Sequence, residues 1–67
     1  MDDISKLHHL LEHWAEHNEE HVKTYLEWAG KAEALGNKEL AGILKKIAGE
    51  TAAMDGLFKK AMKVCGQ

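Results

Sequence analysis

Apolar residues recur along the first half of the chain at spacings that alternate between three and four residues. This spacing places them on one side of an α-helix and is typical of a helix that packs lengthwise against another. We therefore predict a helix over about residues 4–35. Two neighbouring positions at the centre of the stripe, Asn18 and His21, are polar. The predicted core stripe consists of Ile4, Leu7, Leu11, Trp14, Asn18, His21, Tyr25, Trp28, Ala32 and Leu35.

The second half carries a wider apolar face, which predicts another helix over about residues 38–64. The face consists of Leu40, Ile43, Leu44, Ile47, Thr51, Met54, Leu57, Phe58, Ala61, Val64 and Cys65. Glu50 falls inside it. Between the helices, Gly36 suits the left-handed position after a helix, and Asn37 is a strong N-cap for the next. The sequence therefore predicts an all-α fold, an antiparallel helical hairpin forming a single domain over residues 1–67.

Three glycines recur every seven residues on the other side of the second predicted helix, at Gly42, Gly49 and Gly56. Each glycine inside a helix costs about 1 kcal/mol relative to alanine. Their spacing indicates either that another backbone approaches closely on that side, or that the side faces solvent.

The length of the chain limits what one hairpin can bury. A chain of 67 residues covers only about 60% of its unfolded surface, and small chains usually need a disulfide, a metal or a partner. A single cysteine excludes an internal disulfide. Because two hairpins can bury both apolar faces together, we expect a homodimer in the form of a four-helix bundle. Docking onto a larger protein is the alternative.

Charge and composition narrow the classes of partner. Acids dominate residues 1–35 and lysines dominate residues 37–67, which favours antiparallel pairing of the two halves. All nine basic residues are lysines dispersed among apolar residues, so nucleic acid is not expected as a partner. No apolar run approaches the ~20 residues of a membrane span, so no membrane partner is expected. A lone cysteine without a leader-like segment predicts a cytoplasmic location.

Four histidines follow one another at intervals of four residues: His9, His13, His17 and His21. Residues four apart are neighbours on one side of a helix, so consecutive histidines can bind the same metal ion. A period of four drifts by about 40° per step against the helical period of 3.6, so no single ion can take all four. On the predicted core stripe, His17 and His21 are the most inward pair.

The predicted turn also determines which residues of the second helix face this pair. In an antiparallel hairpin with its turn at Gly36, facing residue numbers sum to about 73, which places Thr51 opposite His21. Glu50 then lies one turn away. We therefore predict a metal site, and its ligands are His13, His17, Asn18, His21 and Glu50. Nitrogen and oxygen ligands suit zinc, nickel, ferrous iron or manganese, copper is a further candidate, and the ligand types alone do not choose among them. In a two-fold dimer, His17 and His21 of both chains would instead form one shared four-histidine site.

Other interpretations of these residues stay open. Asn18 and His21 are also the kind of polar residues that fix helix register in a metal-free dimer or protein-interaction module. Cys65, placed near His8 and His9 at the open end of the hairpin, is a candidate second metal site, or else a small hydrophobe or a free thiol. Loops that would hold a substrate are nearly absent, so the sequence does not favour an enzyme.

The segment His13-Trp14-Ala15-Glu16-His17-Asn18-Glu19-Glu20-His21, followed by Tyr25 and Trp28, resembles a group of short archaeal and bacterial proteins of unknown function. They are similar to compact helical hairpins with an H-W-x-x-H-N-x-x-H core. The resemblance implies a metal-linked role, such as the handling of nickel or a similar ion. With such a role, a larger metal-handling protein is a further candidate partner. It also implies that His13, His17, Asn18 and His21 are the residues that matter.

Overall fold

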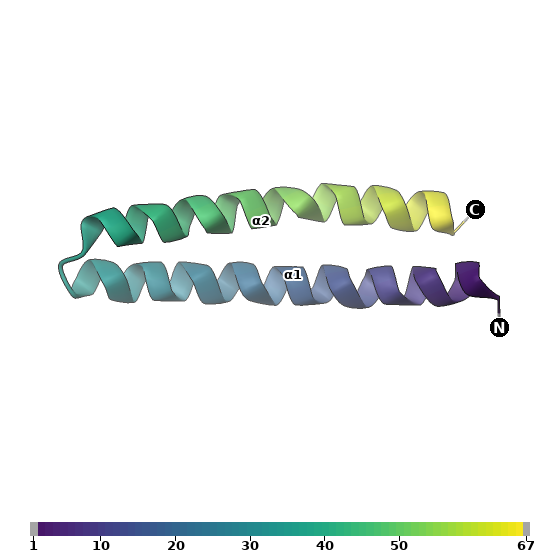
Figure 1. Ribbon diagram of the computed structural model, residues 1–67, viewed down its shortest axis with the longest axis horizontal. Coiled ribbons are helices and arrows are strands. Elements are labelled where there is room, and N and C mark those ends of the chain that lie inside the picture. Colours follow the sequence, from purple (N-terminus) through teal and green to yellow (C-terminus); the bar gives the residue numbers. More distant parts are fainter. Residues whose placement is uncertain (1, 67) are drawn as a thin grey trace.

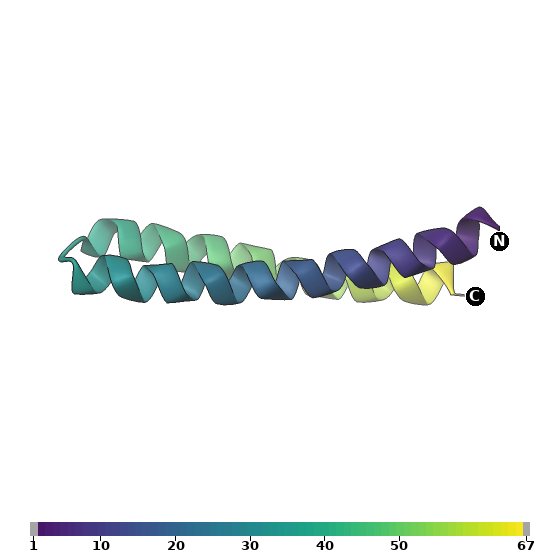
Figure 2. The ribbon, with the colours of Figure 1, turned by 90° about the horizontal axis from the view of Figure 1, so that it is seen from below.

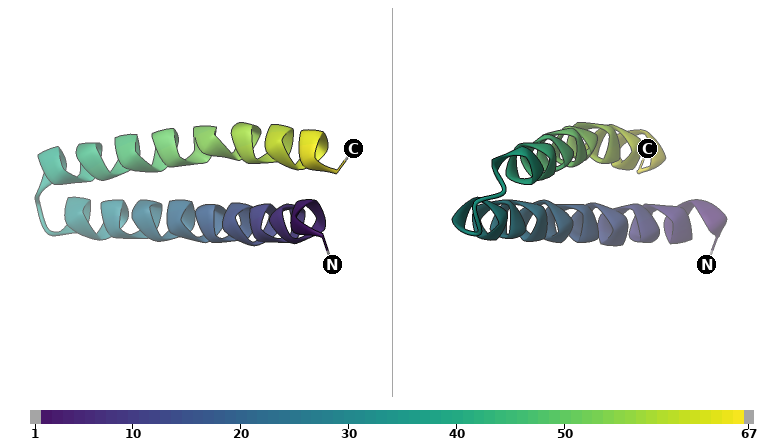
Figure 3. Two further views of the ribbon diagram at one scale, coloured as in Figure 1. Left: turned by 45° about the vertical axis from the view of Figure 1, so that its right-hand side comes forward. Right: turned by 60° about the vertical axis from the view of Figure 1, so that its left-hand side comes forward.

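The computed structural model describes residues 2–66, which form two long helices. Helix α1 spans Asp3–Ala34 and helix α2 spans Lys38–Cys65. They run antiparallel, side by side, with both chain ends at the same end of the hairpin (Figure 1). Rotated views show the helices crossing, so that they wind around each other (Figure 2; Figure 3). The predicted all-α antiparallel hairpin is confirmed. Met1 and Gln67, part of the predicted domain, lie outside the described residues.

Side chains and backbone groups at the helix ends satisfy the amides and carbonyls that a helix leaves unpaired. The Asp2 carboxylate accepts a hydrogen bond from the Ser5 amide at 2.7 Å, which lowers the pKa of Asp2 below its ordinary value. Gly36 adopts a φ of 86°, a left-handed conformation that glycine reaches without strain. Asn37 Oδ1 then accepts from the Leu40 amide at 3.0 Å and starts α2.

Alanine side chains form the centre of the contact between the helices. Within residues 2–66 the buried hydrophobic side chains are Ala15, Ala29, Ala32, Ala41 and Ala48. Together with half-buried neighbours they form one stripe on each helix, which we call the inner seam. On α1 the inner seam is His8, Leu11, Ala15, Asn18, Val22, Tyr25, Ala29 and Ala32. On α2 it is Ala41, Leu44, Ala48, Thr51, Asp55, Phe58, Met62 and Cys65. Both stripes alternate spacings of three and four.

The inner seam differs from the predicted core stripe at every second position of α1. Leu11, Asn18, Tyr25 and Ala32 belong to both. The other positions of the predicted stripe are exposed, namely Ile4, Leu7, Trp14, His21, Trp28 and Leu35. Small side chains one residue further along take their places, because methyl groups let two helices approach more closely than indole rings do. The predicted core stripe was therefore wrong at these positions, where it was displaced by one residue from the inner seam.

The larger side chains form a continuous strip along one side of the hairpin, which we call the apolar face. Its apolar members are Leu7, Trp14, Trp28, Leu35, Leu40, Ile43, Ile47, Met54, Leu57 and Val64, and His21 lies among those of α1; all are exposed. Trp28 and Leu35 line one hollow of about 380 Å³ together with Leu40, so the strip crosses from α1 to α2. On the opposite edge Lys45 pairs with Glu33 at 3.4 Å. Neither helix within residues 2–66 is long and apolar enough to span a membrane.

A larger side chain in the inner seam should force the helices apart. We expect Ala48→Leu to lower the free energy of unfolding by about 1–3 kcal/mol, since overpacking a tight contact costs that much. Ala53→Leu is the matched control, because Ala53 lies in the same part of α2 but is exposed. Urea unfolding followed by circular dichroism measures both. Equal stabilities of the two variants would contradict the assignment of the inner seam.

The three regularly spaced glycines of α2 face open space. A methyl group added at Gly42, Gly49 or Gly56 would meet no atom within 4 Å, so the solvent-facing interpretation of their spacing holds for this hairpin. We therefore expect Gly49→Ala to raise the free energy of unfolding by about 1 kcal/mol through helix propensity alone. Thermal unfolding checks this. A loss of stability would mean that another backbone packs there in solution.

Candidate metal centre

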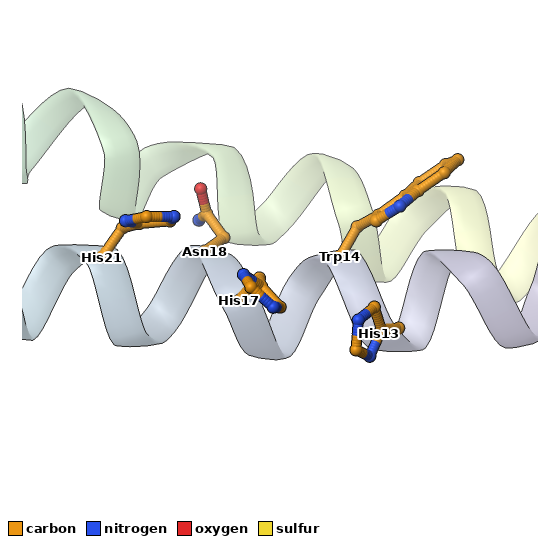
Figure 4. Close-up of a pocket in the computed structure, with 5 residues that line it drawn as sticks. All are labelled: His13, Trp14, His17, Asn18 and His21. Carbon is orange, nitrogen blue, oxygen red and sulfur yellow. The ribbon is translucent and has the colours of Figure 1, made fainter.

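Three of the predicted metal ligands form a row along the outer edge of α1. His13, His17 and His21 are exposed, and we call them the histidine row. With Trp14 and Asn18 they line an open hollow of about 390 Å³. Figure 4 shows Asn18 pointing toward α2, whereas His13 lies on the side of α1 away from α2. The row is therefore reachable from outside the hairpin.

The spacing of the imidazole rings fits chelation of a metal ion by neighbouring pairs. The ring centroids of His13 and His17 are 5.0 Å apart, and those of His17 and His21 are 5.9 Å apart. A metal bound about 2.0–2.1 Å from each nitrogen at a tetrahedral angle holds two ring centroids roughly 5 Å apart. Small side-chain rotations would bring either pair to that spacing. His17 is the member common to both pairs.

Tyr25 and Trp14 border the histidine row, although neither is among the ligands predicted from the sequence. The Tyr25 ring stacks on His21 with centroids 5.9 Å apart and planes 19° apart. Trp14 lines the same hollow as the histidines. Tyr25 lies four residues after His21, and Trp14 lies three residues before His17. Such spacings identify neighbours on one side of a helix. Aromatic walls restrict the rotation of the imidazoles beside them.

Asn18 has a different position from the histidines beside it. Its side chain enters the inner seam, where Nδ2 donates a hydrogen bond to the backbone carbonyl of Thr51 at 2.8 Å. It also borders a hollow of about 260 Å³ together with Asp55. This contact joins the midpoints of the two helices. Only Oδ1 of the amide is then left as a metal ligand.

The structure does not bring all the predicted ligands together in one chain. His21, expected in the core, is exposed on the apolar face because Val22 takes the inner position. Glu50, expected on the inner face, is exposed on α2 and is not among the residues that line the hollow of the histidine row. In residues 2–66 no three His, Cys, Asp or Glu side chains are grouped so that they could hold one ion. As metal ligands, a single hairpin therefore offers neighbouring histidines two at a time.

The open end of the hairpin brings Cys65 close to His8. They border a hollow of about 370 Å³ with Ile4, Ser5 and Gly66. The Cys65 thiol donates to the Ile4 carbonyl at 3.4 Å, and His8 Nδ1 lies 3.4 Å from Glu12. His9 is exposed and does not line this hollow. Cys65, the last residue of the inner seam on α2, thus contacts the first turn of α1.

Comparisons with known proteins place most of the chain within one family. The family model described as Domain of unknown function (DUF8180) matches residues 7–65. An uncharacterized protein of Archaeoglobus fulgidus is 38% identical over 63 residues, which cover 94% of this chain and 100% of the relative. No solved structure gives a significant match to the chain.

The Asn18 hydrogen bond generates a prediction for the midpoint of the hairpin. We expect Asn18→Ala to lower the free energy of unfolding by about 1 kcal/mol, the usual net contribution of such a bond. Thr24→Ala is the control, since its hydroxyl bonds only the Glu20 carbonyl of its own helix, at 3.1 Å. Chemical unfolding should separate the two variants. If Asn18→Ala were as stable as Thr24→Ala, Asn18 would not hold the register.

Proposed function

The chain belongs to the family described as Domain of unknown function (DUF8180), and we propose that it is a small histidine-based metal-binding protein. In this role it would act as a carrier, sensor or chaperone for a transition metal. The observation that carries the proposal is the spacing of the histidine row, with neighbouring rings 5.0 and 5.9 Å apart along an open hollow. An ion could enter and leave this site without unfolding the hairpin.

The donor set favours a particular class of ion. Imidazole nitrogens suit nickel and zinc, and also copper and ferrous iron, whereas manganese prefers oxygen ligands such as Glu50. Zinc bound by histidines takes four ligands when the site is structural and three when a position stays open. A pair from one hairpin falls short of both numbers. Asn18 Oδ1, Glu50 or a second chain would have to complete the set.

The proposal includes the setting in which the site works. Two copies of the hairpin would cover each other's apolar face as a homodimer, and a larger metal-handling protein would exchange the ion with it. A cytoplasmic location would keep Cys65 reduced. The segment His13-Trp14-x-x-His17-Asn18-x-x-His21 would be the functional core of the family.

A metal-free interaction module is the second candidate, favoured by two observations. The apolar face exposes Trp14 at 44% and Trp28 at 54%, which is unusual for side chains of this size unless a partner covers them. Asn18 bonds the opposite helix, as a register-setting residue does. In this function the histidine row would be a polar edge of an interface, and adding metal would change nothing.

Removal of the central histidine tests the proposal directly. We expect the purified chain, stripped of metal, to bind nickel or zinc, and His17→Ala to weaken binding by at least 100-fold because it breaks both neighbouring pairs. Isothermal titration calorimetry measures the affinity, and elemental analysis identifies the ion retained from cells. Acidification should release the ion, because the imidazoles must be deprotonated to bind it.

His9→Ala serves as the matched control, because His9 lies on the same helix and is exposed but does not line the hollow of the histidine row. It should bind metal as the unsubstituted chain does. Equal losses in the two variants would indicate nonspecific binding to surface imidazoles. A chain that binds none of these ions would leave the interaction module as the function.

A further inference from the structure

The apolar face of α1 has the same sequence of side chains when it is followed from either end. At intervals of seven residues it presents Leu7, Trp14, His21, Trp28 and Leu35. The order leucine, tryptophan, histidine, tryptophan, leucine is symmetric about His21. A two-fold interface must be self-complementary, because each residue meets the symmetry mate of its own partner. This stripe meets that condition if two copies of α1 lie antiparallel with His21 on the two-fold axis.

The exposed stripe of α2 has its own centre at the same height along the hairpin. It runs Leu40, Ile43, Ile47, Glu50, Met54, Leu57, Ala61 and Val64, all exposed except the half-buried Ala61, and its midpoint is residue 52. Ala52 and Val22 border the same hollow between the helices, so residue 52 lies level with His21. A single two-fold axis at this height would therefore centre both stripes. On α2 it would pair Leu40 with Val64 and Ile47 with Leu57.

The exposed area of the hairpin is large enough for such a contact. The chain exposes 5247 Å², whereas a compact folded monomer of 7.5 kDa exposes about 4,200 Å². The excess of about 1,000 Å² is comparable to the ~800 Å² per partner that a stable interface buries. Charge also permits the contact, because the acids Glu12, Glu19 and Glu33 lie on the opposite edge of α1. Two apolar faces can meet without bringing those carboxylates together.

We propose that a second copy of the chain covers the apolar face around a two-fold axis through His21, with the two turns at opposite ends. Leu7 would then face Leu35 of the second copy, and Trp14 would face Trp28. The two His21 imidazoles would meet on the axis, each with its own His17 one turn away. The inference rests on the proposed metal-binding function for its ligand, and it adds that the site is shared between two chains.

This arrangement completes what one hairpin lacks. Each chain supplies the pair His17 and His21, and within residues 2–66 no group of three suitable side chains forms in one chain. The axis gathers four imidazoles at the centre of the interface, which is the ligand number that zinc or a similar ion takes in a closed site. Glu50, exposed at nearly the same height on α2, would border this centre from both chains.

Cysteine cross-linking of metal-free protein tests the symmetry independently of the metal. We expect Leu7→Cys with Leu35→Cys, in a Cys65→Ser background, to form a covalent dimer under mild oxidation. The two positions are 28 residues apart on one helix, roughly 42 Å, so they cannot form a disulfide within one chain. Either single cysteine variant in the same background should stay uncross-linked, because its own symmetry mate lies at the far end.

Cross-linking of a single-cysteine variant would overturn the arrangement. If the turns lay at the same end, Leu7→Cys alone would cross-link and the double variant would gain nothing. A metal-free monomer by light scattering, with no cross-linking in any variant, would overturn it as well. Leu26→Glu and Trp14→Glu form a matched pair, since Leu26 is 50% exposed but lies away from the apolar face. Only Trp14→Glu should lower the fraction of dimer.

Native mass spectrometry with nickel or zinc tests the shared site. We expect one ion per two chains, and loss of that ion in His21→Ala at a concentration that saturates the unsubstituted protein. One ion per chain, or an ion that monomeric Trp14→Glu retains, would overturn sharing and leave the proposed function intact. Absence of any ion would overturn the metal site in both proposals, while the cross-linking pattern would still decide the symmetry of the dimer.

Discussion

The close contact between alanine side chains of the two helices determines the rest of the structure. The buried hydrophobic positions of the inner seam are Ala15, Ala29, Ala32, Ala41 and Ala48. Methyl groups let the helix backbones come near each other, and this leaves no room between them for indole or isobutyl groups. The large apolar side chains must therefore lie beside the seam. A hairpin built in this way buries little area for each residue.

The polar residues at the midpoint are divided between these two surfaces. Asn18 lies inside the hairpin, where its side-chain amide donates a hydrogen bond to the Thr51 carbonyl and so links the two helices. His17 and His21 each come one residue before a position of that stripe, lie on the same side of it and remain open to the surroundings. One turn of α1 thus holds both the contact that positions the two helices and the imidazoles that are open to the surroundings. This is the arrangement in which the rigidity of the seam also orients the exposed imidazoles.

The periodicity of the sequence was sufficient to predict both helices, the Gly36 turn, the Asn37 cap and the antiparallel arrangement. It was not sufficient to choose between two stripes of α1 that share Leu11, Asn18, Tyr25 and Ala32. One stripe adds leucine and tryptophan, and the other adds alanine and valine. Hydrophobicity favours the first, whereas helix packing distance selects the second. For the same reason the histidine run was recognisable from its spacing, but the placement of His21 and Glu50 outside the hairpin was not.

The antiparallel topology also has a consequence for the order in which contacts form. Partners next to the turn are separated by few residues, and each step toward the open end adds two more residues to the loop that must be closed. We therefore expect the chain to assemble from Gly36 outward, with the turn containing His8 and Cys65 closing last. The midpoint at Asn18 divides an early half from a late half. A ligand or partner bound there would hold the hairpin together halfway and would leave the terminal turns free to open and close.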